Sequence, residues 1–371
     1  MRFRDWLVAS AGVGLPGERS RPSPVDSNTW PHVLASLTTQ RIAGLALSAI
    51  EQGMLTVAED QQDELHDAHV EAMANCLRIE QHIARVTSLL EAGGIPLRVL
   101  KGSAVAHLDY EDVSLRSFGD ADVLLRAVDI ERGLALLAEA GYRRPAPAAR
   151  VGFDRRFGKG TYLVADDGYE VDVHRTFAMG PYGYTVKPED LWLDHDEFLL
   201  GDLRIPALAS ETRMLHACFH AVVGNPLDRV LPYRDVAEIM LYGEFSWDRV
   251  LELAERWQAS GVVSRALVTT WEVLSIDTEP EQITWARAHP PSKREATMLA
   301  VYAANTSYAA KSVGSLRVMT WSDRLAFVRL LAGSDRSFAR GHSRLRWLLR
   351  GTGRALRHRW PGRGASREPD N

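Results

Sequence analysis

Apolar residues follow a helical period over two long stretches near the start of the chain. In the stretches 30–53 and 61–93 they recur every three or four residues, a pattern typical of amphipathic helices. The second stretch ends at Gly93-Gly94, because glycine often follows the last turn of a helix. We therefore expect an N-terminal helical region over residues 28–93. The first 27 residues are rich in Gly, Pro and Ser, and we expect them to be flexible.

Between residues 94 and 206 short β-prone runs alternate with helical periods. Strands are expected at 95–100 and 121–125, and helices at 103–108 and 130–140. The run TYLVADDGYEVDVHR predicts a β-hairpin, since two β-prone segments flank the turn sequence Asp-Asp-Gly. This alternation is typical of an α/β or α+β unit, and we expect a core of class α+β, a mixed sheet with helices.

The helical period returns after residue 206 in the segments ETRMLHACFHAVV, LPYRDVAEIMLYG, SWDRVLELAERWQASG and VSRALVTTWEVLS. We expect a C-terminal helical domain over residues 207–333, so that the α+β core at 94–206 is embedded between two helical regions. Residues 334–371 form an Arg-rich tail, with ten arginines and no lysine from Asp335 to Asn371.

Three carboxylates lie on the predicted strands. Asp120 and Asp122 stand two residues apart in SFGDADVLL, so both side chains face the same side of a strand. Asp172 lies in the second strand of the hairpin, in YEVDVHR, where His174 shares its face. Clustered carboxylates need a neutralising cation, and Mg²⁺ binds one or two carboxylates together with phosphate oxygens. The three acids therefore indicate a divalent metal site.

An apolar strand upstream of these acids runs into Lys101-Gly102-Ser103 and then into a helix. The N–H groups at a helix start stabilise an anion, and Gly102 lets a phosphate approach the backbone closely. The Ser103 hydroxyl can donate to the same phosphate. Lys101 would add a positive charge, although it could also be the exposed end of a strand. The turn predicts a triphosphate-binding site beside the metal.

Composition limits the other functional classes. The formal net charge of -4 gives no overall nucleic-acid-binding signature. Cys76 and Cys218 lie far apart in apolar helical contexts, which argues against a disulfide framework or a zinc knuckle and favours a reducing cytoplasm. No stretch approaches the ~20 apolar residues of a bilayer-spanning helix, and Asp5 interrupts the short apolar run that could serve as a secretory signal.

The stretch LLEAGGIPLRVLKGSAVAHLDYEDVSLRSFGDADVLL resembles a family described as uncharacterised nucleotidyltransferases, a branch of the polymerase-beta-like nucleotidyltransferase superfamily. The residues that match its pattern are Lys101-Gly102, Arg116, Asp120-Ala121-Asp122 and Asp172-Val173-His174. The similarity runs from about Trp30 to about Leu274. It implies a minimal polymerase-beta-like core, Mg²⁺ or Mn²⁺ as the metal, and a nucleoside triphosphate as co-substrate. The gap from Ser103 to Asp120 is longer than in many superfamily members.

On this resemblance we expect an NMP group to move to an acceptor hydroxyl or phosphate while pyrophosphate leaves. Asp120 and Asp122 would hold metal, and Asp172 would hold metal and act as a base. The nucleotide would contact Lys101, Gly102, Ser103, Arg116 and His174. Phosphoryl transfer, as in a kinase, and a non-catalytic partner-binding role are the alternatives. The acceptor stays open between a small molecule, a peptide, a glycan and RNA.

Several of these residues also have a structural interpretation. Arg116 could pair with Asp112 or Asp120 instead of clamping the triphosphate. His174 could assist proton transfer, orient Asp172, or only satisfy a hydrogen bond. The segment RRFGKG, with Arg155, Arg156 and Lys159, could gather phosphates or form a solvated turn.

His216 and His220 stand four residues apart on a predicted helix, a spacing that suits one zinc ion. The sequence offers no obvious third ligand beside them, so packing under the catalytic core or contact with the nucleotide fits better. The Arg-rich tail could meet an anionic membrane or a nucleic acid, or could hold a last helix that docks on the protein.

Overall fold

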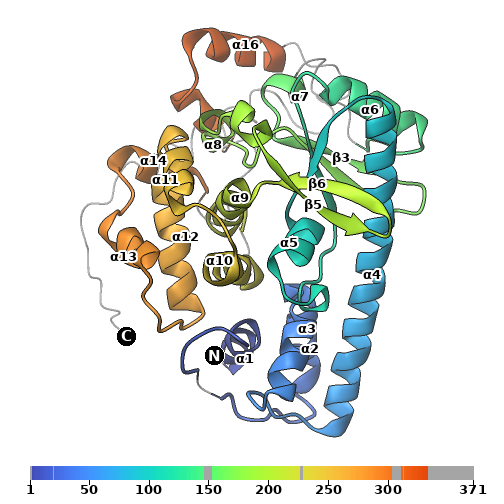
Figure 1. The fold of residues 1–371 in the computed structure, drawn as a ribbon, viewed down its shortest axis with the longest axis vertical. Helices are drawn as coiled ribbons and strands as arrows, with labels where there is room; N and C mark the ends of the chain where they lie inside the picture. The colour runs from blue at the N-terminus through green and yellow to red at the C-terminus, as the bar shows by residue number, and fades with distance from the viewer. Residues whose placement is uncertain are drawn as a thin grey trace, which may run out of the picture.

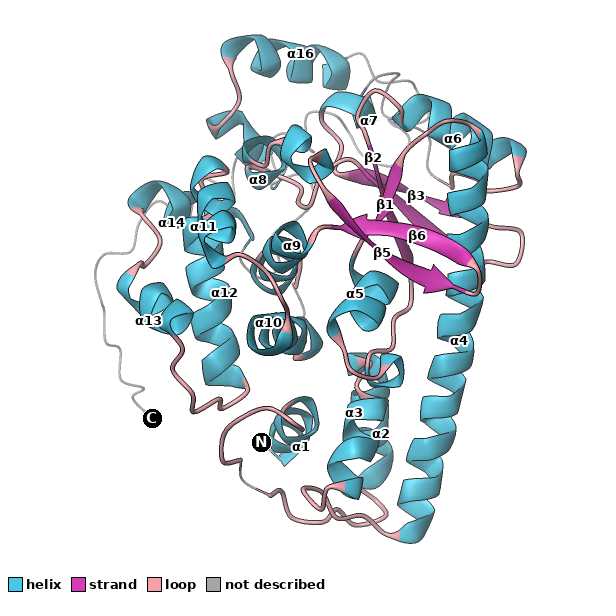
Figure 2. Cartoon of the chain, in the orientation of Figure 1, coloured by secondary structure: helices cyan, strands magenta, loops and turns pink. Residues whose placement is uncertain are grey.

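A six-stranded mixed sheet lies among helices in the computed structural model, which describes residues 2–19, 21–145, 153–225, 229–302, 311 and 313–332 (Figures 1 and 2). The strand order is β3-β4-β2-β1-β6-β5. The strands are β1 (Leu97–Val99), β2 (Ala121–Leu125), β3 (Gly160–Val164), β4 (Glu170–His174), β5 (His195–Leu200) and β6 (Leu203–Leu208). This architecture confirms the expected α+β class.

The centre of the sheet is formed by β2, which pairs antiparallel with β1 and parallel with β4. The outer strands are added as antiparallel hairpins, β3 on β4 and β5 on β6. All five residues of β2 are buried, as expected for a central strand covered on both faces. In the β2–β4 register Asp122 lies directly opposite Asp172.

One face of the sheet is covered by the long helix α4 (Glu59–Ala92) and by α6 (Ile130–Glu139), which flank the sheet in Figure 1. Ile83, Val86 and Leu90 of α4 pack in one buried cluster with Val123 and Leu125 of β2. Because neighbouring side chains on a strand point to opposite faces, the side chains of the acids on β2 and β4 face away from α4. The site therefore opens toward the other helices.

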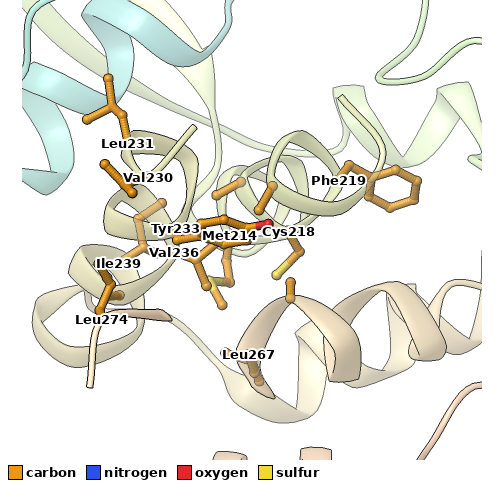
Figure 3. Packing of buried hydrophobic residues seen from close by; sticks show 14 of the residues in the cluster. Met214, Cys218, Phe219, Val230, Leu231, Tyr233, Val236, Ile239, Leu267 and Leu274 are labelled. Atoms are coloured by element: carbon orange, nitrogen blue, oxygen red, sulfur yellow. The ribbon is translucent and has the colours of Figure 1, made fainter. Parts of the chain in front are cut away.

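The remaining helices lie below, to the left of and above the sheet in Figure 1. They are α1 (Arg2–Ala11), α2 (Trp30–Gln40), α3 (Ala43–Glu51), α5 (Lys101–Asp109), the short α7 (Phe153–Arg156) and α8 (Tyr182–Thr185), α9 (Ser210–Val222), α10 (Leu231–Tyr242), α11 (Trp247–Arg256), α12 (Ser260–Val273), α13 (Glu281–Ala288), α14 (Lys293–Leu299) and α16 (Trp321–Ala332). One large apolar cluster joins α1–α3 to α9–α14. Figure 3 shows Met214, Cys218 and Phe219 of α9 packed near residues of α10 and Leu267 of α12.

Three local expectations from the sequence are wrong. The first 27 residues are not uniformly flexible, because α1 buries Trp6 and Arg234 donates to the carbonyls of Ala11 and Val13. The helical stretch 30–53 is broken, since Arg41 adopts a left-handed conformation between α2 and α3. The expected end of the core at residue 206 falls inside β6, in a hairpin that the sequence pattern did not reveal.

Within the described ranges no single helix has the length and apolar composition needed to cross a membrane. Only α2 and α3 taken together reach that length and composition, and they are bent by 119° at their junction. The Arg-rich tail, for which membrane or nucleic-acid contact was considered, lies outside the described residues.

Candidate active site

Asp122, Asp172 and His174 meet on one face of the sheet. The two acids are register partners on β2 and β4, and His174 ends β4 on the same face. One ligand atom from each lies within 4.8 Å of the others, the only such group of three metal-ligating side chains found among the described residues. The sheet register itself therefore brings together the acids from separate parts of the sequence.

The side chain of Lys101 lies between the acids. Its Nζ is 2.8 Å from Oδ2 of Asp122 and 3.1 Å from Oδ2 of Asp120. The backbone aims it there through a tight turn, in which Lys101 has φ 28° and Gly102 has φ 35°. A non-glycine residue at positive φ is strained. The sequence anticipated a lysine near phosphate, whereas this structure shows the ammonium bound to both carboxylates.

Asp120 lies just before β2 and is the more exposed of the paired acids. Besides Lys101 it contacts Arg41, with 3.4 Å between Nη1 and Oδ1. It is not part of the Asp122–Asp172–His174 group. Asp120 and Asp122 thus share the Lys101 ammonium, while Asp172 lies opposite Asp122 on the neighbouring strand.

His174 fixes the position of Asp122. Nε2 of His174 lies 2.7 Å from Oδ1 of Asp122 and 3.6 Å from Oδ2 of Asp172. The expected role of His174 as an orienting residue is therefore directed first at Asp122. Nε2 faces both carboxylates, whereas Nδ1 is buried with no hydrogen-bond partner among the described residues.

Burial and neighbouring charges shift the pKa values of Asp122, Asp172 and Lys101 in opposite directions. Burial raises the pKa of Asp122, but Lys101 and His174 hold it well below its usual value. Burial likewise raises the pKa of Asp172, yet the His174 hydrogen bond and the charge of Lys159 bring it below the ordinary range. Burial lowers the pKa of Lys101, and the two acids outweigh this and raise it. All three groups are therefore charged at neutral pH.

Two residues assigned to the nucleotide have other partners. The Ser103 hydroxyl is buried and donates to Oε1 of Glu80 on α4 at 3.0 Å. Arg116 is buried in an ion pair with Asp235 of α10, with 2.7 Å from Nε to Oδ1 and 2.9 Å from Nη2 to Oδ2. The structural interpretation of Arg116 thus holds, but with a partner that is distant in sequence.

Other basic groups around the acids had only weak sequence signals. Lys159, in the RRFGKG segment, lies near the site, and burial followed by repulsion from Lys101 lowers its pKa. His216 is buried and stacks on Phe177, with ring centroids 4.5 Å apart. In the same segment as Lys159, Arg156 instead pairs with Asp323. Arg156 therefore belongs to a structural ion pair, and a phosphate contact of Lys159 stays a prediction.

A pocket of about 240 Å³ opens beside Lys101, Gly102 and Asp120. Its other walls come from Arg41 at the end of α2, from Arg116 and Phe118 before β2, from His220 of α9, and from the α9–α10 connection and the start of α10. His220 had been considered as a zinc ligand with His216 or as a nucleotide contact. It lines the pocket, and neither histidine belongs to the group of metal-ligating side chains in the described part of the chain.

Comparison with known proteins gives one family match. A family model described as uncharacterised nucleotidyltransferase matches residues 26–275. No curated protein sequence matches the chain. The structure of a lincosamide antibiotic adenylyltransferase, LnuA with lincomycin bound, is 17% identical with a TM-score of 0.31, over 44% of this chain and 96% of that one. An antigenic nucleotidyltransferase-like protein from Paracoccidioides brasiliensis is 12% identical with a TM-score of 0.37, over 58% and 95%.

Proposed function

This chain belongs to the family of uncharacterised nucleotidyltransferases, and we propose that it moves an NMP group from a nucleoside triphosphate to an acceptor hydroxyl or phosphate. The observation that carries the proposal is the placement of Asp122 opposite Asp172, with Lys101 binding Asp122 and Asp120. Three acids with one ammonium bound to two of them make a site that attracts cations, at a strand–turn–helix that could receive phosphates.

The donor set fits a divalent metal. Oδ2 of Asp122 is buried and has no aligned hydrogen bond, although Lys101 lies close to it. Asp122 and Asp172 would hold Mg²⁺ or Mn²⁺ through carboxylate oxygens, with Asp120 beside them. When bound, the metal neutralises charge on the phosphates and holds the reacting groups in line.

The chain's own residues divide the remaining tasks. Asp172 is the accessible acid, because 39% of its side chain is exposed against 1% for Asp122. Being ionised at neutral pH, it can accept the proton of the acceptor hydroxyl. His174 keeps the Asp122 carboxylate in place through its Nε2 proton. The ammonium of Lys101 can exchange its contacts with the carboxylates for contacts with the triphosphate.

The test is release of pyrophosphate from each of the four NTPs, with magnesium and a panel of acceptors. Asp122→Asn and Asp172→Asn keep the side-chain shape but remove a charge, and each should lower the rate by about a hundredfold or more. Asp202→Asn, at the exposed turn between β5 and β6, is the control. Full activity of Asp122→Asn would contradict the proposal.

Labelled ATP separates nucleotidyl transfer from phosphoryl transfer. The α-phosphate label should appear on the acceptor and the γ-phosphate label should leave with pyrophosphate. A γ-label on the acceptor would instead identify a phosphotransferase built on the same fold.

A further inference from the structure

The pocket beside Lys101 is built by parts of the chain that lie far apart in sequence. Gln40 and Arg41 come from the end of α2 and the break after it. Asn225 and Arg229 come from the connection between α9 and α10. Asp172 is not among the residues that line this pocket.

Positive charge dominates the pocket walls. Arg41, Lys101, Arg116 and Arg229 line it, against Asp120 as the one carboxylate. Arg116 is neutralised by Asp235. Arg229 differs, because within the described residues its guanidinium has neither a hydrogen bond nor an ion pair. A half-exposed and unpaired arginine in a concave site is well suited to bind an anion.

The backbone around Arg229 is held in place. The Asn225 side chain accepts from the Arg229 N–H at 2.9 Å and donates to the Arg229 carbonyl at 2.8 Å. Gln40 accepts from the N–H of Val230 at 3.0 Å and so fastens this connection to α2. These hydrogen bonds fix the backbone at Arg229 and do not involve its guanidinium.

Arg41 is positioned by the chain break and by a glycine. Its φ of 60° turns the chain between α2 and α3, and its guanidinium lies over Gly119. A Cβ at Gly119 would lie 2.3 Å from Nη2 of Arg41, so the absence of a side chain there makes room for the guanidinium. Its partner is Asp120 at 3.4 Å, a weak ion pair that binding of a metal by Asp120 would release.

We propose that Arg41 and Arg229 bind the terminal phosphates of the nucleoside triphosphate, which leave as pyrophosphate. The inference rests on the proposed function and adds the subsite that the two helical regions contribute. The described residues of the pocket walls include two rings, Phe118 and the imidazole of His220, against four cationic side chains, so phosphates suit the pocket better than a base does.

The assignment agrees with the charge balance of the reaction. The acceptor oxygen forms a bond to the α-phosphorus and gives its proton to Asp172. The bond from the α-phosphorus to the bridging oxygen breaks, and that oxygen leaves with the β- and γ-phosphates. Negative charge therefore accumulates on the pyrophosphate, where two guanidinium groups would stabilise it most.

The test is isothermal titration calorimetry of the full chain with MgATP, magnesium pyrophosphate and AMP. Arg41→Gln and Arg229→Gln should each weaken ATP and pyrophosphate binding by about tenfold or more, because each removes a charge-assisted contact. AMP binding should stay unchanged. Arg204→Gln is the control, since Arg204 is exposed on β6 and pairs with Glu197. Thermal melting of each variant confirms that it is folded.

The outcomes separate the two proposals. Wild-type binding of MgATP with unchanged ATP and pyrophosphate affinity in both variants would overturn the pocket assignment and leave the proposed function standing. An equal loss for AMP would also overturn it, since the pocket would then hold the nucleoside. If the wild-type chain binds none of the four NTPs with magnesium, the proposed function fails and the subsite with it.

Discussion

At the scale of single residues, the ammonium of Lys101 stands where a metal would be expected to neutralise the acids. It is close to Asp122 and Asp120 and reaches them through a strained turn. An ammonium held in this way stabilises the two carboxylates before any substrate binds. When a metal binds the carboxylates, the ammonium must either move away or share them with the metal. Lys101 is therefore expected to compete with the metal and to assist the nucleotide.

Replacing Lys101 by methionine separates these two effects. Lys101→Met should tighten Mn²⁺ binding by roughly tenfold, because a competing charge is removed, and should weaken MgATP binding. Free Mn²⁺ measured by electron paramagnetic resonance reports the first effect directly. Lys293→Met, on the exposed start of α14, is the control. Mn²⁺ affinity that is unchanged or lower in Lys101→Met would contradict this competition.

A second prediction at this scale concerns His216. Burial, followed by repulsion from Lys101, lowers its pKa well below 6.5. The folded protein thus holds His216 neutral, while the unfolded chain takes up a proton as the pH falls below about 6.5. Its contribution to stability is complete above that pH and is lost below it, by up to about 1.4 kcal/mol per pH unit.

Urea unfolding at pH 7.5 and pH 5.5 measures this loss. In His216→Gln the fall in the free energy of unfolding between the two pH values should be smaller than in the wild type. An identical fall in both proteins would assign the pH dependence to other groups.

At the scale of elements, the Arg116–Asp235 pair connects the segment before β2 to α10. Both side chains are almost fully buried, and the Tyr110 hydroxyl donates to Oδ1 of the same aspartate at 3.0 Å. Breaking a buried pair leaves one charge without a partner, which costs more than removing both. The pair therefore fixes the relative position of the acid-bearing strand and the helical half.

Asp235→Ala should lower the free energy of unfolding by about 3–5 kcal/mol, measured by urea denaturation. Adding Arg116→Met to the same chain should recover part of that loss, because the unpaired guanidinium is then absent. A double variant less stable than Asp235→Ala alone would show that Arg116 stabilises the fold by other contacts.

The elements also show what the sequence could and could not predict. β1, β2 and the β3–β4 hairpin follow from local alternation and turn chemistry, and with them the grouping of Asp122 and Asp172. The break at Arg41 has no glycine to mark it, and the partner of Ser103, Glu80, lies on a helix that precedes it in sequence. Such tertiary contacts leave no periodic signal. Arg229 was missed for the same reason.

At the scale of the whole molecule, the N-terminal helices and the helices that follow the sheet share one core. Trp6 of α1 and Trp257, which follows α11, belong to the same apolar cluster. The helical regions on either side of the catalytic core therefore support each other, and we expect the described part of the molecule to unfold in a single transition.

Trp6→Ala tests this expectation. The side chain is 1% exposed, so its loss should lower the free energy of unfolding by about 3–5 kcal/mol and shift the whole calorimetric transition. Trp321→Ala, at a side chain that is 77% exposed, should change stability by less than about 0.5 kcal/mol. Early melting of only part of the molecule in Trp6→Ala would indicate independent units instead.

The parallel pairing of β2 with β4 has a consequence for protein engineering. Since side chains alternate across a strand, adding or deleting one residue within β4 would swing the carboxylate of Asp172 through to the α4 side. Lengthening the surface loop at Gly168, where an added Cβ would meet open space, would leave the spacing of the two carboxylates unchanged. Reporter peptides are therefore best inserted at that loop. Single-residue indels in β4 are expected to abolish turnover and to destabilise the fold, because they also move Val171 and Val173 out of the core under α4.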